Sequence, residues 1–245
     1  MFNFFTDLAP VNGQYRITGK DYNHVKNVLR MKIGDALLVS DGNKSSLCKI
    51  TDITDSAVIV DIDVEDYKDT NLPIDIHLFQ GLPKADKMEL IIQKCVELGV
   101  NEITPVEMKR CIVKLEKNKK DAKTSRWQAI SESAAKQSKR NCIPVVNPVI
   151  SFSDLLDKIS DYDLFIIPYE NKDGMLSTKQ ALEQIKAGMK IGVLIGPEGG
   201  FEESEVLSAT DKNGITVSLG RRILRTETAA ITTLSMLMLH AEINL

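Results

Sequence analysis

The chain has 245 residues and 43% hydrophobic content, which is enough for one large domain or two modest domains with buried cores. Its net charge of −3 means that the overall composition does not indicate nucleic-acid binding. The sequence contains no run of about 18 apolar residues, so no membrane span is expected. The first stretch, MFNFFTDLAP, lacks the cationic and apolar regions of a signal peptide.

The cysteines and histidines are scattered. Cys48, Cys95, Cys111 and Cys142 form no C-x-x-C pair, and the three histidines fit no metal-ligand spacing. This pattern predicts a reduced, cytoplasmic protein without a bound metal.

Charge is distributed unevenly along the chain. Residues 81–142 carry a net charge of +6, and residues 109–126 contain eight basic residues against two acidic ones. This segment predicts either a contact with an anionic partner or a solvated, lysine-rich surface.

Residues 1–70 are typical of a small β-rich domain. The apolar runs 36–40 and 47–50 are separated by Asp41-Gly42-Asn43, a strong signal for a hairpin. Residues 57–64 alternate toward their end like a half-buried strand. Several short strands favour closure into a compact barrel, and the polar stretch 67–73 is interpreted as a domain linker.

The remainder of the chain alternates between predicted strands and helices. We expect strands at 74–79, 102–106, 163–168, 190–195 and 215–219, and helices at 84–98, 125–139, 176–186, 202–211 and 226–242. Thr124 or Ser125 is the expected cap of the second helix. Such alternation predicts a parallel α/β sheet covered on both faces, with ligands bound beyond the carboxyl ends of the strands. Three late loops would lie there, at 168–170, 196–200 and 220–225.

The stretch LIGPEGGF (194–201) places a glycine-rich loop directly after a buried strand. Its spacing matches neither the dinucleotide pattern G-x-G-x-x-G nor a Walker A loop, so neither NAD nor ATP is favoured. Because glycine lets another molecule approach the backbone closely, this loop is a candidate ligand cradle, although a tight turn would use the same residues.

The stretch SLGRRILRTETAA (218–230) has a similar design, with a short strand, a glycine and the start of a helix. Arg221, Arg222 and Arg225 lie where the positive end of a helix disfavours cations. They therefore indicate an anionic or carbonyl-rich partner, or else an internal ion pair with an acid such as Glu227.

Several stretches together resemble one known family. LIGPEGGFEESEV (194–206) and LGRRILRTETAAI (219–231) are similar to the signature of the RsmE family, which comprises 16S ribosomal RNA uridine N3-methyltransferases of the SPOUT superfamily. VLRMKIGD (28–35), KADKMELIIQKCVELGVNEITPV (84–106) and RWQAISESAAKQSKR (126–140) resemble it too. The resemblance spans nearly the whole chain in the family's order. One departure is Arg221, where the family usually has proline.

The resemblance implies an α/β fold of two domains. An N-terminal PUA-like β-barrel would occupy 1–70, and a SPOUT methyltransferase domain with a C-terminal trefoil knot would occupy 74–245. It also implies a homodimer and S-adenosylmethionine held in the knot. The implied cofactor contacts are Pro168, Ile195, Gly196, Gly199, Gly200, Leu219, Gly220, Leu224, Thr228 and Ala229.

Methylation of uridine N3 requires loss of the N3 proton or stabilisation of the resulting anion. Arg225 is the first candidate, because a planar guanidinium can pair with a uracil carbonyl or a phosphate. Glu198 or Glu227 would accept the proton or hold the arginine. Glu198 has a simpler interpretation as the cap of the helix at 202–211.

The resemblance also implies binding to the 16S rRNA of the small ribosomal subunit. The predicted RNA contacts are Arg30, Arg110, Arg126, Gln137 and Arg140, since arginine forks match phosphate. Arg30 could instead form a surface salt bridge, and Gln137 could simply face solvent. Trp127 is more typical of a core residue than of a base-stacking one.

Two other functions remain open from the sequence. One is a SPOUT enzyme acting on a different RNA nucleoside, and the other is a non-catalytic RNA binder in ribosome assembly. The intact GPEGG and LRTETA stretches argue against the second. The broad apolar face of the last helix predicts core packing together with a dimer interface.

Overall fold

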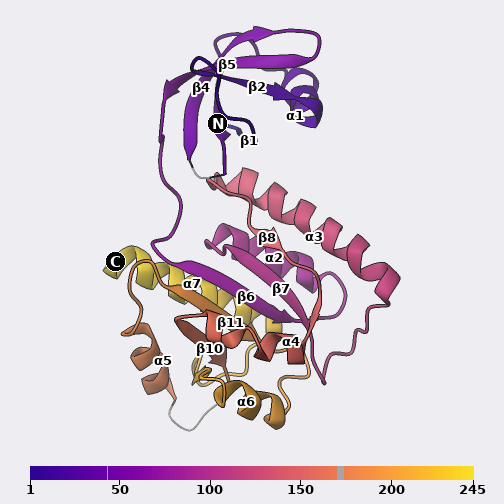
Figure 1. Ribbon diagram of the computed structural model, residues 1–245, viewed down its shortest axis with the longest axis vertical. Helices are drawn as coiled ribbons and strands as arrows, with labels where there is room; N and C mark the ends of the chain where they lie inside the picture. The colour runs from indigo at the N-terminus through magenta and orange to yellow at the C-terminus, as the bar shows by residue number, and fades with distance from the viewer. Residues whose placement is uncertain (43, 170–173) are drawn as a thin grey trace. The chain divides into compact units, whose positions relative to one another are not determined.

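The computed structural model describes residues 1–42, 44–169 and 174–245, so Asn43 and Glu170 of two predicted loops lie outside the described residues. It contains two compact units, coloured by residue number in Figure 1. The first is Met1–Asn71 with Ala135–Ile143, and the second is Leu72–Ala134 with Pro144–Leu245. In the described part of the chain, no helix has the length and apolar character needed to cross a membrane.

The first unit contains a five-stranded sheet in the order β1-β3-β4-β5-β2. Its elements are β1 (Asn3–Phe5), β2 (Gln14–Thr18), α1 (Gly19–Asn23), the π-helical turn His24–Val28, β3 (Ala36–Ser40), β4 (Ser45–Ile53) and β5 (Ala57–Val64). The predicted strands in 36–40, 47–50 and 57–64 are confirmed, whereas β1, β2 and α1 were not predicted. Apolar side chains such as Phe4, Leu37 and Val60 form its core.

Residues Ala135–Ile143 join the first unit through hydrogen bonds as well as packing. The Asn141 side chain donates to Asp69 Oδ1 and accepts from the Ser45 and Thr70 hydroxyl groups, each at 3.1 Å. Asn141 and Ser45 are buried, so leaving their polar groups unpaired would carry a desolvation cost. Contacts between residues so distant in sequence gave no signal in the local pattern.

The second unit is built on a parallel sheet in the order β12-β10-β11-β6-β7-β8, with β9 also pairing with β7. The strands are β6 (Asp75–Gly81), β7 (Glu102–Glu107), β8 (Val145–Val146), β9 (Ile150–Ser151), β10 (Leu164–Pro168), β11 (Lys190–Ile195) and β12 (Ile215–Val217). The prediction of a parallel α/β sheet is confirmed. β11 spans the predicted residues, since Ile191–Ile195 are buried and bounded by turns.

Helices connect these strands. They are α2 (Lys87–Glu97), α3 (Lys117–Ser138), α4 (Phe152–Leu156), α5 (Met175–Leu182), α6 (Glu203–Thr210) and α7 (Thr226–Asn244). α2 and α7 pack against each other (Figure 1). The predicted start of the second helix at Thr124 or Ser125 is wrong. Lysine favours helix, so the lysine-rich segment continues the helix upstream to Lys117.

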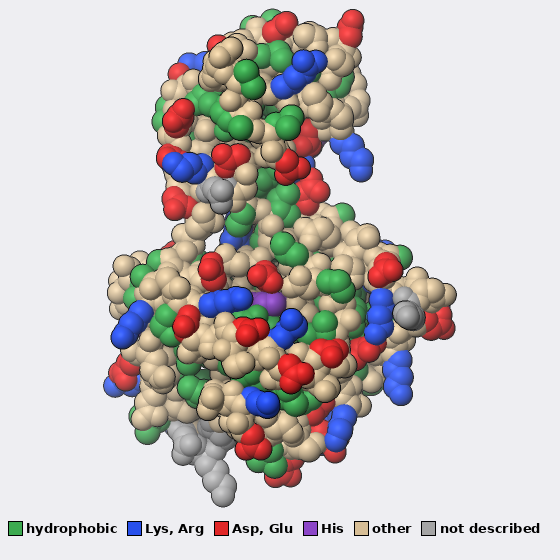
Figure 2. All heavy atoms as spheres, in the orientation of Figure 1, with side chains coloured by type: hydrophobic (Ala, Val, Ile, Leu, Met, Phe, Trp, Pro, Cys, Tyr) green, Lys and Arg blue, Asp and Glu red, His purple; other side chains and the backbone are tan. Residues whose placement is uncertain are grey.

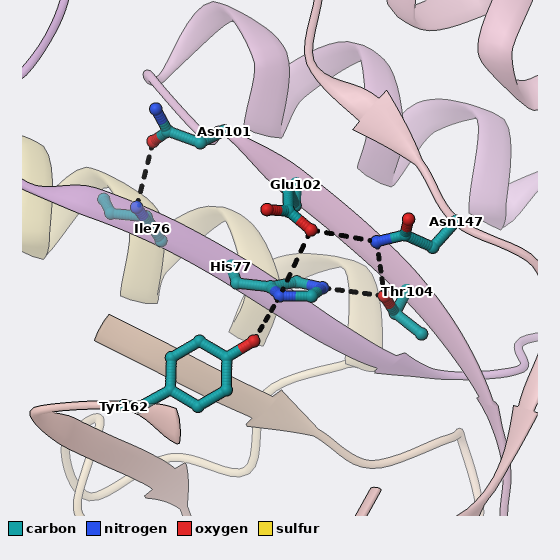
Figure 3. A network of polar contacts seen from close by, with 7 residues as sticks. All are labelled: Ile76, His77, Asn101, Glu102, Thr104, Asn147 and Tyr162. Carbon is teal, nitrogen blue, oxygen red and sulfur yellow. Dashed lines mark hydrogen bonds and ion pairs between the residues drawn. The ribbon is translucent and has the colours of Figure 1, made fainter. Parts of the chain in front are cut away.

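A buried polar network lies in the sheet around His77 of β6 (Figure 3). His77 Nε2 lies 2.7 Å from Thr104 Oγ1, and the Tyr162 hydroxyl group contacts His77 Nδ1. Asn147 Nδ2 donates to Thr104 Oγ1 at 2.9 Å and to Glu102 Oε2 at 3.1 Å. A neutral imidazole satisfies this geometry, accepting from Tyr162 at Nδ1 and donating to Thr104 from Nε2.

This network predicts an acid-sensitive component of stability. Burial lowers the pKa of His77 to about 4; Glu102 opposes this shift, and Lys190 and Lys158 add to it. In the unfolded chain the pKa returns to about 6.5. Between these values the unfolded state binds a proton that the folded state does not. The free energy of unfolding therefore falls as pH decreases from about 6.5 to about 4, by a few kcal/mol at most.

Urea denaturation across this pH range measures the effect, with His77→Gln as the comparison. The difference between wild type and His77→Gln cancels the titration of carboxylates common to both. That difference should shrink as pH falls through the window and stay constant above about pH 7. A difference independent of pH would contradict a neutral, buried His77.

Candidate functional site

A pocket of about 770 Å³ opens at the carboxyl ends of three neighbouring strands in the second unit. The loops after β10, β11 and β12 line it together with the start of α7. Of the predicted cofactor contacts, it brings together Pro168, Ile195, Gly196, Gly199, Gly200, Leu219, Gly220, Leu224 and Ala229. Thr228 is exposed and does not line the pocket. The three predicted loops therefore do meet at one edge of the sheet.

The glycines of the β11 loop serve both its shape and its packing. Gly200 has a φ of +69°, and its N–H donates to the Pro197 carbonyl oxygen at 2.9 Å, which closes a turn. A Cβ at Gly196 would lie 3.2 Å from the Phe201 ring, and one at Gly199 would lie 3.0 Å from Arg110. The loop is bare partly because its own neighbours approach it so closely.

A buried threonine ties two of the pocket loops together. Thr226 Oγ1 donates to the Gly196 carbonyl oxygen at 2.6 Å and accepts from Gln80 Nε2 at 2.9 Å. Both side chains are withdrawn from water, so losing either bond would leave buried polar groups unpaired. The end of β6, the β11 loop and the start of α7 are therefore held in one arrangement.

The loop after β12 has its own anchor, which is provided by Thr178 of α5. Thr178 Oγ1 donates to the Ser218 carbonyl oxygen at 2.6 Å and accepts from the Ser218 N–H at 3.1 Å. Gly220 follows with a φ of +107°, which only glycine adopts readily. The chain turns there toward the three arginines.

Glu198 faces α2 and not α6. Its Oε1 atom accepts from the Lys84 N–H at 2.9 Å and lies 3.2 Å from Lys87 Nζ. Burial would raise the pKa of Glu198, but the hydrogen bonds from backbone N–H groups and from Lys87 outweigh it and hold the pKa below its usual value. The interpretation of Glu198 as a helix cap is wrong, because Glu202 and Glu205 form the capping box of α6.

Glu227 lies in the first turn of α7, where the helix dipole favours an acid, and its Oε2 atom is 3.3 Å from Lys87 Nζ.

The Arg221, Arg222 and Arg225 side chains are exposed at the pocket. Among residues the structure describes, none of them forms an ion pair or side-chain hydrogen bond, so the alternative of an internal Arg–Glu pair finds no support there.

The predicted RNA contacts have different environments. Arg110 is exposed at the pocket edge, its Nη1 atom 3.4 Å from the Gly199 carbonyl oxygen. Arg126 forms a bidentate ion pair with Glu89, with Nε 2.8 Å from Oε1 and Nη2 3.0 Å from Oε2. Arg140 is only 3% exposed, which does not suit a surface phosphate contact in this conformation. Gln137 is exposed, as is Arg30, which has a φ of +52°.

Trp127 is buried, as the core interpretation predicted. The basic segment 109–126 is partly neutralised within the protein: Lys120 pairs with Glu107 at 2.9 Å and Lys109 lies 3.9 Å from Glu202. On the face shown in Figure 2, basic and acidic side chains are intermixed. The exposed arginines at the pocket are therefore the more distinctive cationic feature.

Sequence reasoning missed Gln80, Lys87 and Thr226. Gln80 had a usable signal, since it is a polar residue that follows the apolar pair Leu78-Phe79 near the end of a buried strand. Lys87 also had one, because a cation in the first turn of a helix calls for a compensating partner. Thr226 gave none, as its two partners are distant in sequence.

Comparison with known proteins places this geometry in a class. Residues 70–238 match the family model described as an RNA methyltransferase domain, and residues 17–63 match an RNA methyltransferase PUA domain. The fold is thus that of an RNA methyltransferase with an N-terminal PUA-like domain.

Individual relatives narrow this class to one family. Ribosomal RNA small subunit methyltransferase E of Bacillus subtilis is 37% identical over 233 residues, covering 94% of this chain and 91% of its own. The crystal structure of the Neisseria gonorrhoeae enzyme of that name, bound to S-adenosyl methionine, has a TM-score of 0.84 at 32% identity, covering 98% of this chain and 97% of its own. A Legionella pneumophila putative methyltransferase with the same cofactor has a TM-score of 0.82 at 31% identity, covering 97% and 96%. The chain belongs to the ribosomal RNA small subunit methyltransferase E family.

Proposed function

We propose that this protein uses S-adenosylmethionine to methylate N3 of uridine 1498 in 16S rRNA of the small ribosomal subunit. The observation that carries the proposal is the pocket at the ends of β10, β11 and β12. Its walls are bare backbone loops, and its opening carries three exposed arginines. An RNA substrate would place the enzyme in the cytoplasm. The first unit would bind RNA and the second unit would carry out methyl transfer.

The pocket residues fit an adenosyl cofactor. Gly196 and Gly200 line one side with backbone that carries no side chain, and Leu219 and Leu224 provide apolar surface on the other. Backbone polar groups with apolar walls are the usual lining of a site for a small, partly polar ligand. When bound, the cofactor supplies an activated methyl group, so the protein's main tasks are orientation and charge stabilisation.

Arg225 is the residue best placed to act on the nucleophile. The N3 atom of uracil carries a weakly acidic proton, and its loss leaves negative charge on the flanking carbonyl oxygens. An exposed guanidinium at the pocket can donate two hydrogen bonds to such an anion. The pKa of Glu198 is lowered by hydrogen bonds from backbone N–H groups, including that of Lys84, and from the Lys87 side chain, which makes Glu198 a weak base near neutral pH, so we assign it an orienting role.

We also propose that the C-terminal segment forms the trefoil knot expected of the superfamily. Close backbone passage supports this proposal. A Cβ at Gly81 would lie 2.7 Å from Pro197, and Thr226 reaches the Gly196 carbonyl oxygen across the same region. Glycine is required where two backbones approach so closely.

A homodimer through α7 completes the proposal. The outer face of this helix presents an apolar surface that includes Ile231, Met236, Leu239 and Ile243, of which Ile243 is 74% exposed. An exposed apolar patch of this kind often marks a surface that associates with another protein. Sedimentation equilibrium tests it directly, and a monomer at micromolar concentration would refute it.

The cofactor assignment is tested at Gly196. The Cβ of Gly196→Ala would need a small shift of the Phe201 ring, whereas the branched side chain of Gly196→Val requires more room than the loop has. We expect affinity for S-adenosylmethionine, measured by calorimetry, to fall modestly in the first variant and to be lost in the second. Circular dichroism serves as the folding control. Affinity in folded Gly196→Val equal to wild type would remove this pocket from consideration.

The RNA surface is tested by salt dependence. Each phosphate contact contributes about 0.7–0.9 to the slope of log affinity against log salt concentration. Arg110→Gln should reduce the slope by about that amount. Arg140→Gln should leave it unchanged in the folded protein, because the guanidinium is buried. If Arg110→Gln keeps the full slope, the phosphate contacts lie elsewhere, with Arg30 of the first unit as the next candidate.

The chemical step is tested at Arg225. Arg225→Lys keeps the charge but loses the fork, and loss of one preorganised donor typically costs about 10²–10³ in rate. Single-turnover methylation at saturating RNA and cofactor isolates this step. The wild-type rate should rise with pH and then level off once the uracil or its base is deprotonated. The control is Arg221→Pro, which introduces the residue usual in the family and should retain activity.

The site of the methyl group decides between nucleosides. Labelled methyl should map to N3 of one uridine in the small-subunit rRNA. Label on a ribose, or an Arg225→Lys enzyme as fast as wild type, would contradict the proposed chemistry while leaving the cofactor site standing.

A further inference from the structure

Lys87 joins two parts of the pocket that are far apart in sequence. It begins α2, lines the pocket and places its ammonium group 3.2 Å from Glu198 Oε1 and 3.3 Å from Glu227 Oε2. Glu198 belongs to the loop after β11, and Glu227 to the first turn of α7. One cation therefore bridges the two segments that also meet at Thr226 and Gly196.

The position of Lys87 is explained by its partners and not by its helix. A cation in the first turn opposes the helix dipole, so an isolated α2 would disfavour it. The two carboxylates reverse this balance, since their side chains are only 21% and 15% exposed and their charges need compensation. Glu227 Oε2 is buried and has no hydrogen-bond partner within the described residues, so its ion pair with Lys87 at 3.3 Å compensates its charge.

We propose that Lys87 is a positioning residue of the methyltransferase: its ammonium group holds Glu198 and Glu227 together and so sets the spacing of the β11 loop and the start of α7 at the cofactor pocket. This inference rests on the proposed function above. Lys87 acts through the two carboxylates and not on the reacting atoms.

Removing the ammonium group has a consequence for protonation. Two carboxylates that share one site repel each other, and the pKa of one of them rises until it accepts a proton. A carboxyl–carboxylate hydrogen bond can then replace the bridge, but only at acidic pH. At alkaline pH both groups are charged and the loops are driven apart. A side chain that merely fills space would produce no such pH dependence.

Calorimetric titration of the full chain with S-adenosylmethionine between about pH 6 and pH 8.5 tests the proposal without any RNA. Wild type should bind with nearly constant affinity. Lys87→Met should bind about tenfold more weakly or worse at the alkaline end, since hydrogen bonds to charged groups contribute on that order, and should recover toward wild type at the acidic end. Lys87→Arg, which keeps the charge, should remain within a few fold of wild type.

Two further variants distinguish charge compensation from general damage. Lys84→Met removes a neighbouring lysine whose side chain is exposed, and it should bind like wild type at every pH. Lys87→Met combined with Glu198→Gln removes the repulsion, so the double variant should bind more tightly than Lys87→Met at alkaline pH and show no recovery on acidification. Lys87→Gln provides the same comparison if Lys87→Met does not fold.

The inference is overturned if Lys87→Met binds as wild type throughout, or if its loss of affinity is independent of pH and unrelieved by Glu198→Gln. These results would leave the proposed function intact. Conversely, wild type that binds the cofactor but methylates a ribose would end the N3 assignment without affecting this test.

Discussion

The arrangement of the site depends on one buried hydroxyl group. Thr226 Oγ1 accepts from Gln80 and donates to the Gly196 carbonyl oxygen, which connects the end of β6, the loop after β11 and the start of α7. A buried polar group without a partner costs about 1–3 kcal/mol, so these three segments keep a common geometry or lose both bonds. The pocket exists because parallel strands end at one edge of the sheet, and this contact joins the segments that meet there.

Charge is divided between the two sides of the same pocket. On one side a single ammonium group, that of Lys87, faces the carboxylates of Glu198 and Glu227, so their charge is only partly compensated within the protein. On the other side the described residues provide no acidic partner for the exposed arginines of the β12–α7 loop. A polyanion would therefore be drawn to the arginine side, and the cofactor would be enclosed by the compensated side.

The sequence predicted those features that follow from local pattern. The limits of β11 and the start of α7 were foreseen because an apolar run is bounded by turn residues in one case and a helix follows a glycine loop in the other. Features that depend on distant partners were not foreseen. Asn141 hydrogen-bonds to Asp69, so the segment after α3 belongs with the first unit, and Arg140 is buried although its local sequence is that of a basic surface. Local pattern was also misleading at the start of α3. Thr124 and Ser125 resemble capping residues, but the helix begins upstream of them at Lys117, in a segment with good helix propensity.

Under the proposed function, the position of Arg110 would connect RNA binding to the loop after β11. Its backbone lies so close to Gly199 that a Cβ there would be 3.0 Å away, and its guanidinium reaches the Gly199 carbonyl oxygen. A phosphate that attracts this side chain would compete for the same donor, because arginine prefers an anionic acceptor to a carbonyl. The GPEGG loop would then lose one contact on its outer side while Thr226 and Lys87 hold its inner side. The outer side of the loop could then move when RNA binds, while its inner contacts keep the pocket walls in place.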